Sequence, residues 1–218
     1  MIKAVLLDVG GVLLLPGPEL VRPALPIPPP SVAVLDRAHY RALAVAHATP
    51  APDWETYFRV YAASCGVDEM LVPRAAAGLR AAFAQQVWTR IVPGAAVLLR
   101  RLRSAGMRIA LVSNADGHLE GHLRALGLCR VGVEVDAILD SAIVGSAKPD
   151  PTLFVLALAE LGVDANQAVH VGDTVGADVA GALAAGIRPL HYVPYGDCDV
   201  ASPAHEHLRW LSDLLTIS

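Results

Sequence analysis

The sequence has few charged residues and no segment in which charges of one sign gather. Of its 218 residues, 17% are charged, and the formal net charge is −4 at pH 7. A protein that binds nucleic acid normally carries a basic stripe or patch that neutralises phosphates. No such stripe is present, so we expect no nucleic-acid partner.

Long apolar runs are lacking too, although 54% of the residues are hydrophobic. No uninterrupted apolar segment approaches the roughly 20 residues that a membrane-spanning helix needs. The short apolar run near the N-terminus is interrupted by Asp8, and no small-residue cleavage site follows it closely. A secretory signal would have an uninterrupted apolar region followed closely by a small-residue cleavage site. The sequence therefore predicts no membrane partner and a cytoplasmic location.

Cysteine is scarce. The three cysteines, Cys65, Cys129 and Cys198, are scattered and form no C-x-x-C motif. An odd number at such spacings does not suggest a disulfide framework. We expect all three to be reduced and unreactive. Internal repeats are absent as well.

The clearest feature that is present is the first strand and the turn after it. The apolar residues 4–7 end in Asp8, and Gly10 and Gly11 follow. Continuous apolar sequence is typical of a buried parallel strand. A glycine pair lets the backbone turn sharply and approach a ligand closely. Asp8 is thus predicted at the carboxyl end of a strand, where open α/β sheets bind their ligands.

The next segment has a helical pattern. The proline-rich stretch 22–30 is predicted to be a stiff polyproline-like connector without regular helix. Three helices are predicted after it: from Ser31 to before Pro50, from Asp53 to Gly66, and from about Arg74 to Val87. We interpret residues 16–89 as an inserted helical subdomain. Its aromatic residues are interpreted mainly as its core, namely Trp54, Tyr57, Phe58 and Tyr61.

Strands and helices alternate from Pro93 to the C-terminus. The predicted strands are 108–113, 135–139, 168–172 and 189–193, and the predicted helices are 95–104, 119–126, 151–161, 175–185 and 206–215. Repeated βα units of this length indicate a parallel sheet with helices on both faces. The predicted fold class is α/β, a doubly wound parallel sheet built from residues 1–15 and 90–218.

Polar residues follow the later strands at the same edge as Asp8. They are Ser113 and Asn114 after the second strand, Lys148 after the third, and Asp173 and Asp178 after the fourth. Mg²⁺ prefers oxygen ligands, usually one or two carboxylates with phosphate and water. Asp8, Asp173 and the backbone carbonyl of Gly10 are candidate ligands.

A carboxylate at this edge has a second use besides metal binding. It can attack phosphorus and form an aspartyl-phosphate, which splits one difficult step into two. The metal and Lys148 would offset the charge of the transferred group, while Ser113 and loop amides would bind its oxygens. The sequence therefore favours phosphoryl chemistry on a small phosphorylated molecule.

These motifs, taken in order, resemble the four signatures of the haloacid dehalogenase superfamily: Asp8-Val-Gly-Gly-Val-Leu, Ser113-Asn, Lys148-Pro-Asp-Pro, and Gly172-Asp followed by Asp178. The resemblance implies a Rossmann-like core with a helical cap over the site. It implies that Asp8 is the nucleophile, Ser113 the phosphate-binding hydroxyl and Lys148 the charge-neutralising lysine. Asp173 would bind Mg²⁺, with Asp178 as a ligand or a support. We add Asn114 and Gly11 to the candidate substrate-binding residues.

One position departs from the superfamily's pattern. Its phosphatases usually carry a second Asp two residues after the nucleophile as general acid and base, and this chain has Gly10 there. A positioned proton donor contributes about 10²–10⁴-fold in rate. Its loss should slow alkyl phosphates most, because their leaving oxygen needs a proton. Dehalogenases lack this Asp, since a departing halide needs no proton, but they commonly replace the residue that corresponds to Asp173.

The leading prediction is therefore a Mg²⁺-dependent phosphatase without the usual second Asp. Two alternatives stay open: a metal-independent hydrolase of the 2-haloacid dehalogenase type, and a catalytically silent relative that binds a phosphorylated ligand. Among the histidines, His170 is expected in the core of a strand. His118 and His122 lie one helical turn apart and are interpreted as a solvated helix face. The substrate and the oligomeric state do not follow from the sequence.

Overall fold

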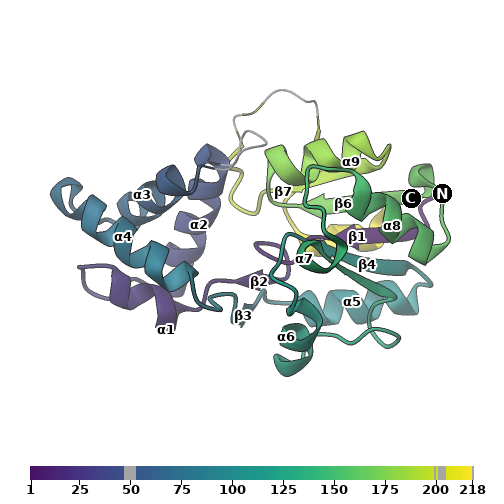
Figure 1. The fold of residues 1–218 in the computed structure, drawn as a ribbon, viewed down its shortest axis with the longest axis horizontal. Helices are drawn as coiled ribbons and strands as arrows, with labels where there is room; N and C mark the ends of the chain where they lie inside the picture. Colours follow the sequence, from purple (N-terminus) through teal and green to yellow (C-terminus); the bar gives the residue numbers. More distant parts are fainter. Residues whose placement is uncertain (47–52, 199, 201–204, 218) are drawn as a thin grey trace.

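The computed structural model describes residues 1–46, 53–198, 200 and 205–217 (Figure 1). Its described residues form one six-stranded parallel sheet in the order β5–β4–β1–β6–β7–β8. The strands are β1 (Ala4–Leu7), β4 (Arg108–Ser113), β5 (Ala137–Asp140), β6 (Ala168–Gly172), β7 (Arg188–Tyr192) and β8 (Glu206–Leu208). Helices cover both faces of this sheet, which confirms the predicted fold class.

Strand β1 lies at the centre of the sheet, between β4 and β6. Its side chains alternate between the two faces. Val5 and Leu7 belong to a buried cluster that includes α5, whereas Ala4 and Leu6 belong to a second cluster that includes α8. Because both faces of β1 are covered, its sequence is continuously apolar.

The core helices follow the predicted alternation closely. Figure 1 shows α8 and α9 on one side of the sheet and α5 on the other. The helices of the core are α5 (Ala95–Ser104), α6 (Leu119–Ala125), α7 (Ser141–Val144), α8 (Thr152–Leu161), α9 (Ala180–Ala184), the 3₁₀ helices η3 (Ala165–Gln167) and η5 (Leu211–Thr216), and the π-helix η4 (Val175–Val179). None of the helices in the described residues is both long and apolar enough to cross a membrane.

A group of helices stands apart from the sheet at the left of Figure 1. This group, called the helical cap below, contains α1 (Pro18–Val21), the 3₁₀ helices η1 (Arg22–Ala24) and η2 (Glu69–Leu71), α2 (Val32–Ala46), α3 (Trp54–Ser64) and α4 (Val72–Phe83). Two short antiparallel strands, β2 (Leu14–Leu15) and β3 (Arg90–Ile91), connect it to the core. The division of the chain at residues 16 and 89 stays a prediction. Pro50, where we ended the first cap helix, lies outside the described residues.

The aromatic residues of α3 divide into two groups. Tyr57, Phe58 and Tyr61 are buried, as expected for a cap core, whereas Trp54 is 44% exposed. Ser31 lies before α2, and its hydroxyl accepts a hydrogen bond from the N–H of Val34 at 3.3 Å. The predicted N-terminal signal of this helix is therefore present in the structure.

Two sequence predictions are wrong. The proline-rich stretch begins with regular structure, because η1 covers Arg22–Ala24 and a proline is tolerated in the first turn of a helix. The predicted terminal helix 206–215 is replaced by β8 and η5. Pairing with β7 satisfies the backbone groups on one side of β8. The three-residue spacing of Leu211 and Leu214, both buried, fits a 3₁₀ helix as well as an α-helix.

Candidate active site

The carboxyl ends of β1, β4 and β6 meet where the strand order reverses, with β4 and β5 on one side of β1 and β6, β7 and β8 on the other. Ligands of open α/β sheets bind at such a switch point. Asp8 follows β1 directly, and its N–H donates to the carbonyl of Val171 in β6 at 2.8 Å. The Asp8 side chain is buried, and its Oδ1 lies 2.8 Å from Nζ of Lys148.

Lys148 is the buried cation of this site. Its Nζ lies 2.6 Å from Oδ1 of Asp178 in addition to the contact with Asp8. Burial alone would lower the pKa of Lys148, but the carboxylates of Asp178 and Asp8 raise it above its usual value. The amide of Asn114 holds the lysine's backbone from both sides: Oδ1 accepts from Lys148 N–H at 2.8 Å, and Nδ2 donates to its carbonyl at 3.1 Å.

Each carboxylate oxygen of Asp178 accepts two hydrogen bonds. Its Oδ1 accepts from Lys148 and from Nε2 of His170 at 3.0 Å, and its Oδ2 accepts from the N–H and hydroxyl of Thr174 at 3.1 and 2.5 Å. Burial would raise the pKa of Asp178, but Lys148 and His170 lower it well below its usual range. This geometry lets Asp178 position Lys148. It also confirms that His170 is a buried strand residue.

Asp173 has the opposite electrostatic environment. Burial, followed by the charges of Asp8 and Asp178, raises the pKa of Asp173 well above its usual value, and Lys148 offsets only part of this. Gly11 permits the close approach, because its φ is +69° and a Cβ atom there would overlap Oδ2 of Asp173. The Gly11 N–H donates to the carbonyl of Leu14 at 2.8 Å, so this amide is engaged within the turn.

The three carboxylates gather around one point. Asp8, Asp173 and Asp178 each offer an oxygen, and these oxygens lie within 4.8 Å of one another. Three carboxylates and one ammonium carry a formal charge of −2 in a buried place. Unbalanced buried charge is costly, and a divalent cation with oxygen ligands would balance it. The donor set therefore fits a metal such as Mg²⁺.

A cavity of about 550 Å³ opens between this cluster and the helical cap. Its core side includes Asp8, Ser113, Lys148 and Asp173. Its cap side is formed by apolar and amide-bearing residues, namely Leu43, Trp54, Phe83, Ala84, Gln85, Gln86 and Trp88. The buried hydroxyl of Ser113 thus lies in the same cavity as the carboxylate cluster.

Trp88 fills the space next to Gly10. A Cβ atom at Gly10 would lie 3.3 Å from Cη2 of the Trp88 ring. The carbonyl of Trp88 accepts a hydrogen bond from Nε2 of His122 at 2.7 Å. The prediction of a solvated helix face is therefore wrong for His122, which is half-buried and lines the cavity. The prediction is confirmed for His118, which is exposed. Nothing in the sequence pattern linked residues 88 and 122.

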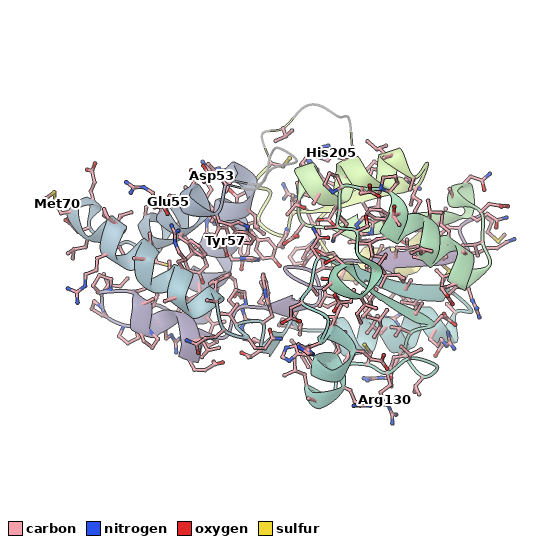
Figure 2. All side chains as sticks on the ribbon, in the orientation of Figure 1. Asp53, Glu55, Tyr57, Met70, Arg130 and His205 are labelled. Carbon is pink, nitrogen blue, oxygen red and sulfur yellow. The ribbon has the colours of Figure 1, made fainter. Side chains whose placement is uncertain are left out.

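The helical cap also contacts the carboxylate cluster directly. His39 of α2 is buried, with Nε2 3.8 Å from Oδ2 of Asp173 and Nδ1 2.7 Å from the hydroxyl of Tyr57. Figure 2 shows Tyr57 on the side of the cap that faces the core. The hydroxyl of Tyr40 donates to the carbonyl of Gly11 at 2.5 Å. The sequence pattern does not distinguish His39 or Tyr40 from other cap residues, and it predicts Tyr57 only as part of the cap core.

A buried carboxylate cluster at the switch point of a parallel sheet, beside a cavity that reaches a helical cap, defines the binding site of an α/β protein. A family model described as "haloacid dehalogenase-like hydrolase" matches residues 2–186. The chain therefore belongs to the haloacid dehalogenase-like hydrolases, as the order of its motifs predicted.

Several curated proteins are similar over part of the chain. "Haloacid dehalogenase-like hydrolase domain-containing protein 3" of Mus musculus is 38% identical over 99 residues, which is 45% of this chain and 38% of that protein. "Ribulose-1,5-bisphosphate 5-phosphatase" of Halopiger xanaduensis is 36% identical over 115 residues, 52% of this chain and 47% of that protein. These matches span about half or less of each relative.

Solved structures match over nearly the whole chain. The "2-Haloacid Dehalogenase" of Pseudomonas syringae has a TM-score of 0.59 and 27% identity, covering 98% of this chain and 96% of that one. The "HAD phosphatase" of Thermococcus onnurineus has a TM-score of 0.62 and 19% identity, covering 99% and 97%. The second likeness shows the fold alone.

Proposed function

We propose that this protein is a Mg²⁺-dependent hydrolase of small phosphorylated metabolites, acting through an aspartyl-phosphate on Asp8. The observation that carries the proposal is the buried cluster of three carboxylates, two of which contact the one buried lysine, with a formal charge of −2. A similar phosphatase of Halopiger xanaduensis supports the same reaction class. The cavity between core and cap has room for a small metabolite.

The metal would be held by the side-chain carboxylates of Asp8 and Asp173 and by the backbone carbonyl of Gly10. Asp178 would support them, because its oxygens already accept hydrogen bonds from Lys148, His170 and Thr174. Bound Mg²⁺ would offset the negative charge of the phosphate and of the cluster.

The protein's own groups would then carry the reaction. One oxygen of Asp8 attacks phosphorus, the bond from phosphorus to the ester oxygen breaks, and the leaving oxygen takes a proton from solvent water, because Gly10 supplies no acid. Water then cleaves the acyl-phosphate and restores the carboxylate. Lys148 balances charge on the transferred group, and the Ser113 hydroxyl donates to one of its oxygens. Asn114 keeps Lys148 in place through the two backbone hydrogen bonds described above.

A dehalogenase is the second candidate, favoured by Gly10 and by the similar structure from Pseudomonas syringae. A 2-haloacid carries a carboxylate, which needs a cationic partner. The described residues that line the cavity include four aspartates, Lys148 and His122 but no arginine, and the two nearest partners of Lys148 are themselves carboxylates. This charge balance favours a metal-assisted reaction on phosphate over binding of a 2-haloacid.

The deciding experiment assays the purified chain on aryl, acyl and sugar phosphates and on 2-haloacids, with Mg²⁺ and with a chelator. We expect phosphate release that requires Mg²⁺ and no halide release. Halide release in the presence of the chelator would instead establish the dehalogenase. No turnover of any substrate, together with measurable Mg²⁺ binding, would establish the catalytically silent relative.

Gly10→Asp alone is expected to change turnover little, because its Cβ would press against the Trp88 ring. In a Gly10→Asp/Trp88→Ala double variant the carboxyl has room, and turnover of alkyl phosphates should rise by up to about 10²-fold, more than that of aryl phosphates. The measurement is kcat/KM for a matched alkyl and aryl pair, with Trp88→Ala as the control. Equal gains on both substrates would contradict the proton-donor argument.

The raised pKa of Asp173 predicts how stability depends on pH and metal. The pKa of Asp173 is higher in the folded state than its unfolded value of 3.8. The carboxyl therefore stabilises the fold fully at pH values below 3.8, and this stabilisation is lost as pH rises through the folded-state pKa. Without metal, Asp173→Asn should therefore be more stable than the wild type at about pH 8, and the difference should shrink towards pH 5. The free energy of unfolding in urea, with a chelator present, measures both.

Mg²⁺ should reverse this order at about pH 8. A ligand at 100 times its dissociation constant stabilises a protein by about 2.7 kcal/mol, and Asp173→Asn should lose this gain. If Mg²⁺ stabilises neither protein, the cluster is not a magnesium site.

A further inference from the structure

A second cluster of metal-ligating side chains lies at the edge of the sheet, outside the cavity. His191 of β7 and His207 of β8 are partners in the parallel register, so their side chains lie on the same face. Cys198 and His205 belong to the segment that joins the two strands. Each of the four offers one ligand atom, and these atoms lie within 4.8 Å of one another. Figure 2 labels His205 at the upper edge of the core.

Two separations within this cluster match the edges of a zinc tetrahedron. Zinc binds imidazole nitrogen at about 2.0–2.1 Å and thiolate sulfur at about 2.3 Å, so tetrahedral angles place two nitrogens about 3.3 Å apart and nitrogen and sulfur about 3.5 Å apart. In the structure, Nδ1 of His191 lies 3.2 Å from Nε2 of His205, and Sγ of Cys198 lies 3.5 Å from the same Nε2.

The surroundings of His191 fit a metal ligand as well. Its Nε2 donates to the backbone carbonyl of Asp173 at 3.2 Å, which leaves the lone pair on Nδ1 for the side towards Nε2 of His205. A hydrogen bond from the second ring nitrogen to a carbonyl is the usual support of a metal-binding histidine.

We propose that His191, Cys198, His205 and His207 bind one zinc ion, a site separate from the carboxylate cluster. The Cys198 thiol binds as the thiolate and releases its proton to solvent. His191 and Cys198 are buried or half-buried, whereas His207 is exposed and closes the site on the solvent side. The ion fastens Cys198 and His205 to the edge of the sheet. Through His191 it also braces the backbone of Asp173.

Cobalt is a suitable probe, because Co²⁺ takes the same tetrahedral ligands and is coloured. We expect the chelator-treated protein to bind one equivalent of Co²⁺ with tetrahedral visible bands and a thiolate-to-cobalt charge-transfer band, both lost when Zn²⁺ is added but not with excess Mg²⁺. Cys198→Ser should remove the charge-transfer band. Cys129→Ser, which changes a buried thiol elsewhere in the core, should keep it. Asp8→Asn should keep it too, which separates this site from the proposed magnesium site.

His207→Ala offers a second measurement at an exposed position, where the fold should tolerate the change. It should lower zinc affinity more than about 10-fold while the charge-transfer band remains. Absence of any charge-transfer band at one equivalent of Co²⁺, a band that survives Cys198→Ser, or unchanged affinity in His207→Ala would each overturn the proposal. In that case the four side chains form a hydrogen-bonded cluster only.

Discussion

Replacing Asp8 with Asn is expected to lower the rate of Mg²⁺-dependent phosphate release by at least about 10³-fold, since loss of a nucleophile typically costs that much or more. The substitution is nearly isosteric and keeps an oxygen that can accept the hydrogen bond from Lys148. It also removes one of three crowded negative charges. The fold should therefore persist, and the loss should appear in kcat rather than in expression or melting temperature.

Asp116→Asn is the matched control, because Asp116 lines the same cavity but is exposed. Its turnover should stay within a few-fold of the wild type. Trapping with radiolabelled substrate adds an independent readout: the wild type should carry acid-stable label on Asp8, and Asp8→Asn should carry none. If Asp8→Asn keeps more than a tenth of wild-type activity, Asp8 is not the nucleophile.

The sheet and the polar residues at the carboxyl ends of its strands could be predicted from the sequence, because both depend on local patterns. A continuous apolar run predicts a buried strand, and parallel strands place their carboxyl ends at one edge. Asp8, Ser113, Lys148 and Asp173 were found in this way, and the structure places all four around one cavity. Sequence order alone did not show how Asp178 differs from Asp173, because that difference depends on which donors surround each carboxylate.

What the sequence could not predict depends on contacts between distant segments. Trp88 lies beside Gly10 because β3, which begins two residues later, pairs with β2, and Gly10 bridges to Leu14 of β2. His191 and His207 form a pair only because 206–208 is a strand, and the leucine spacing there suggested a helix instead. Cys198 was expected to be unreactive because it stands alone in the sequence. In the structure it lies 3.5 Å from Nε2 of His205.

Lys148→Met is expected to lower both activity and stability, because it leaves Asp8 and Asp178 buried without their shared cation. Removing one partner of a buried ion pair typically costs about 3–5 kcal/mol. The Lys148 side chain is buried and lies within 2.8 Å of both carboxylates, so solvent cannot replace it. Chemical denaturation in the presence of a chelator measures the loss of stability, and phosphate release with Mg²⁺ measures the loss of activity.

The chain provides its own control, because Lys3 is the only other lysine and is exposed. Lys3→Met should change stability by no more than about 0.5 kcal/mol. Adding Asp178→Asn to Lys148→Met should recover part of the lost stability but none of the activity, since it removes an unpaired buried charge without restoring the cation. If the double variant is less stable than Lys148→Met, then Asp178 stabilises the fold mainly through His170 and Thr174, and the charge argument for this cluster fails.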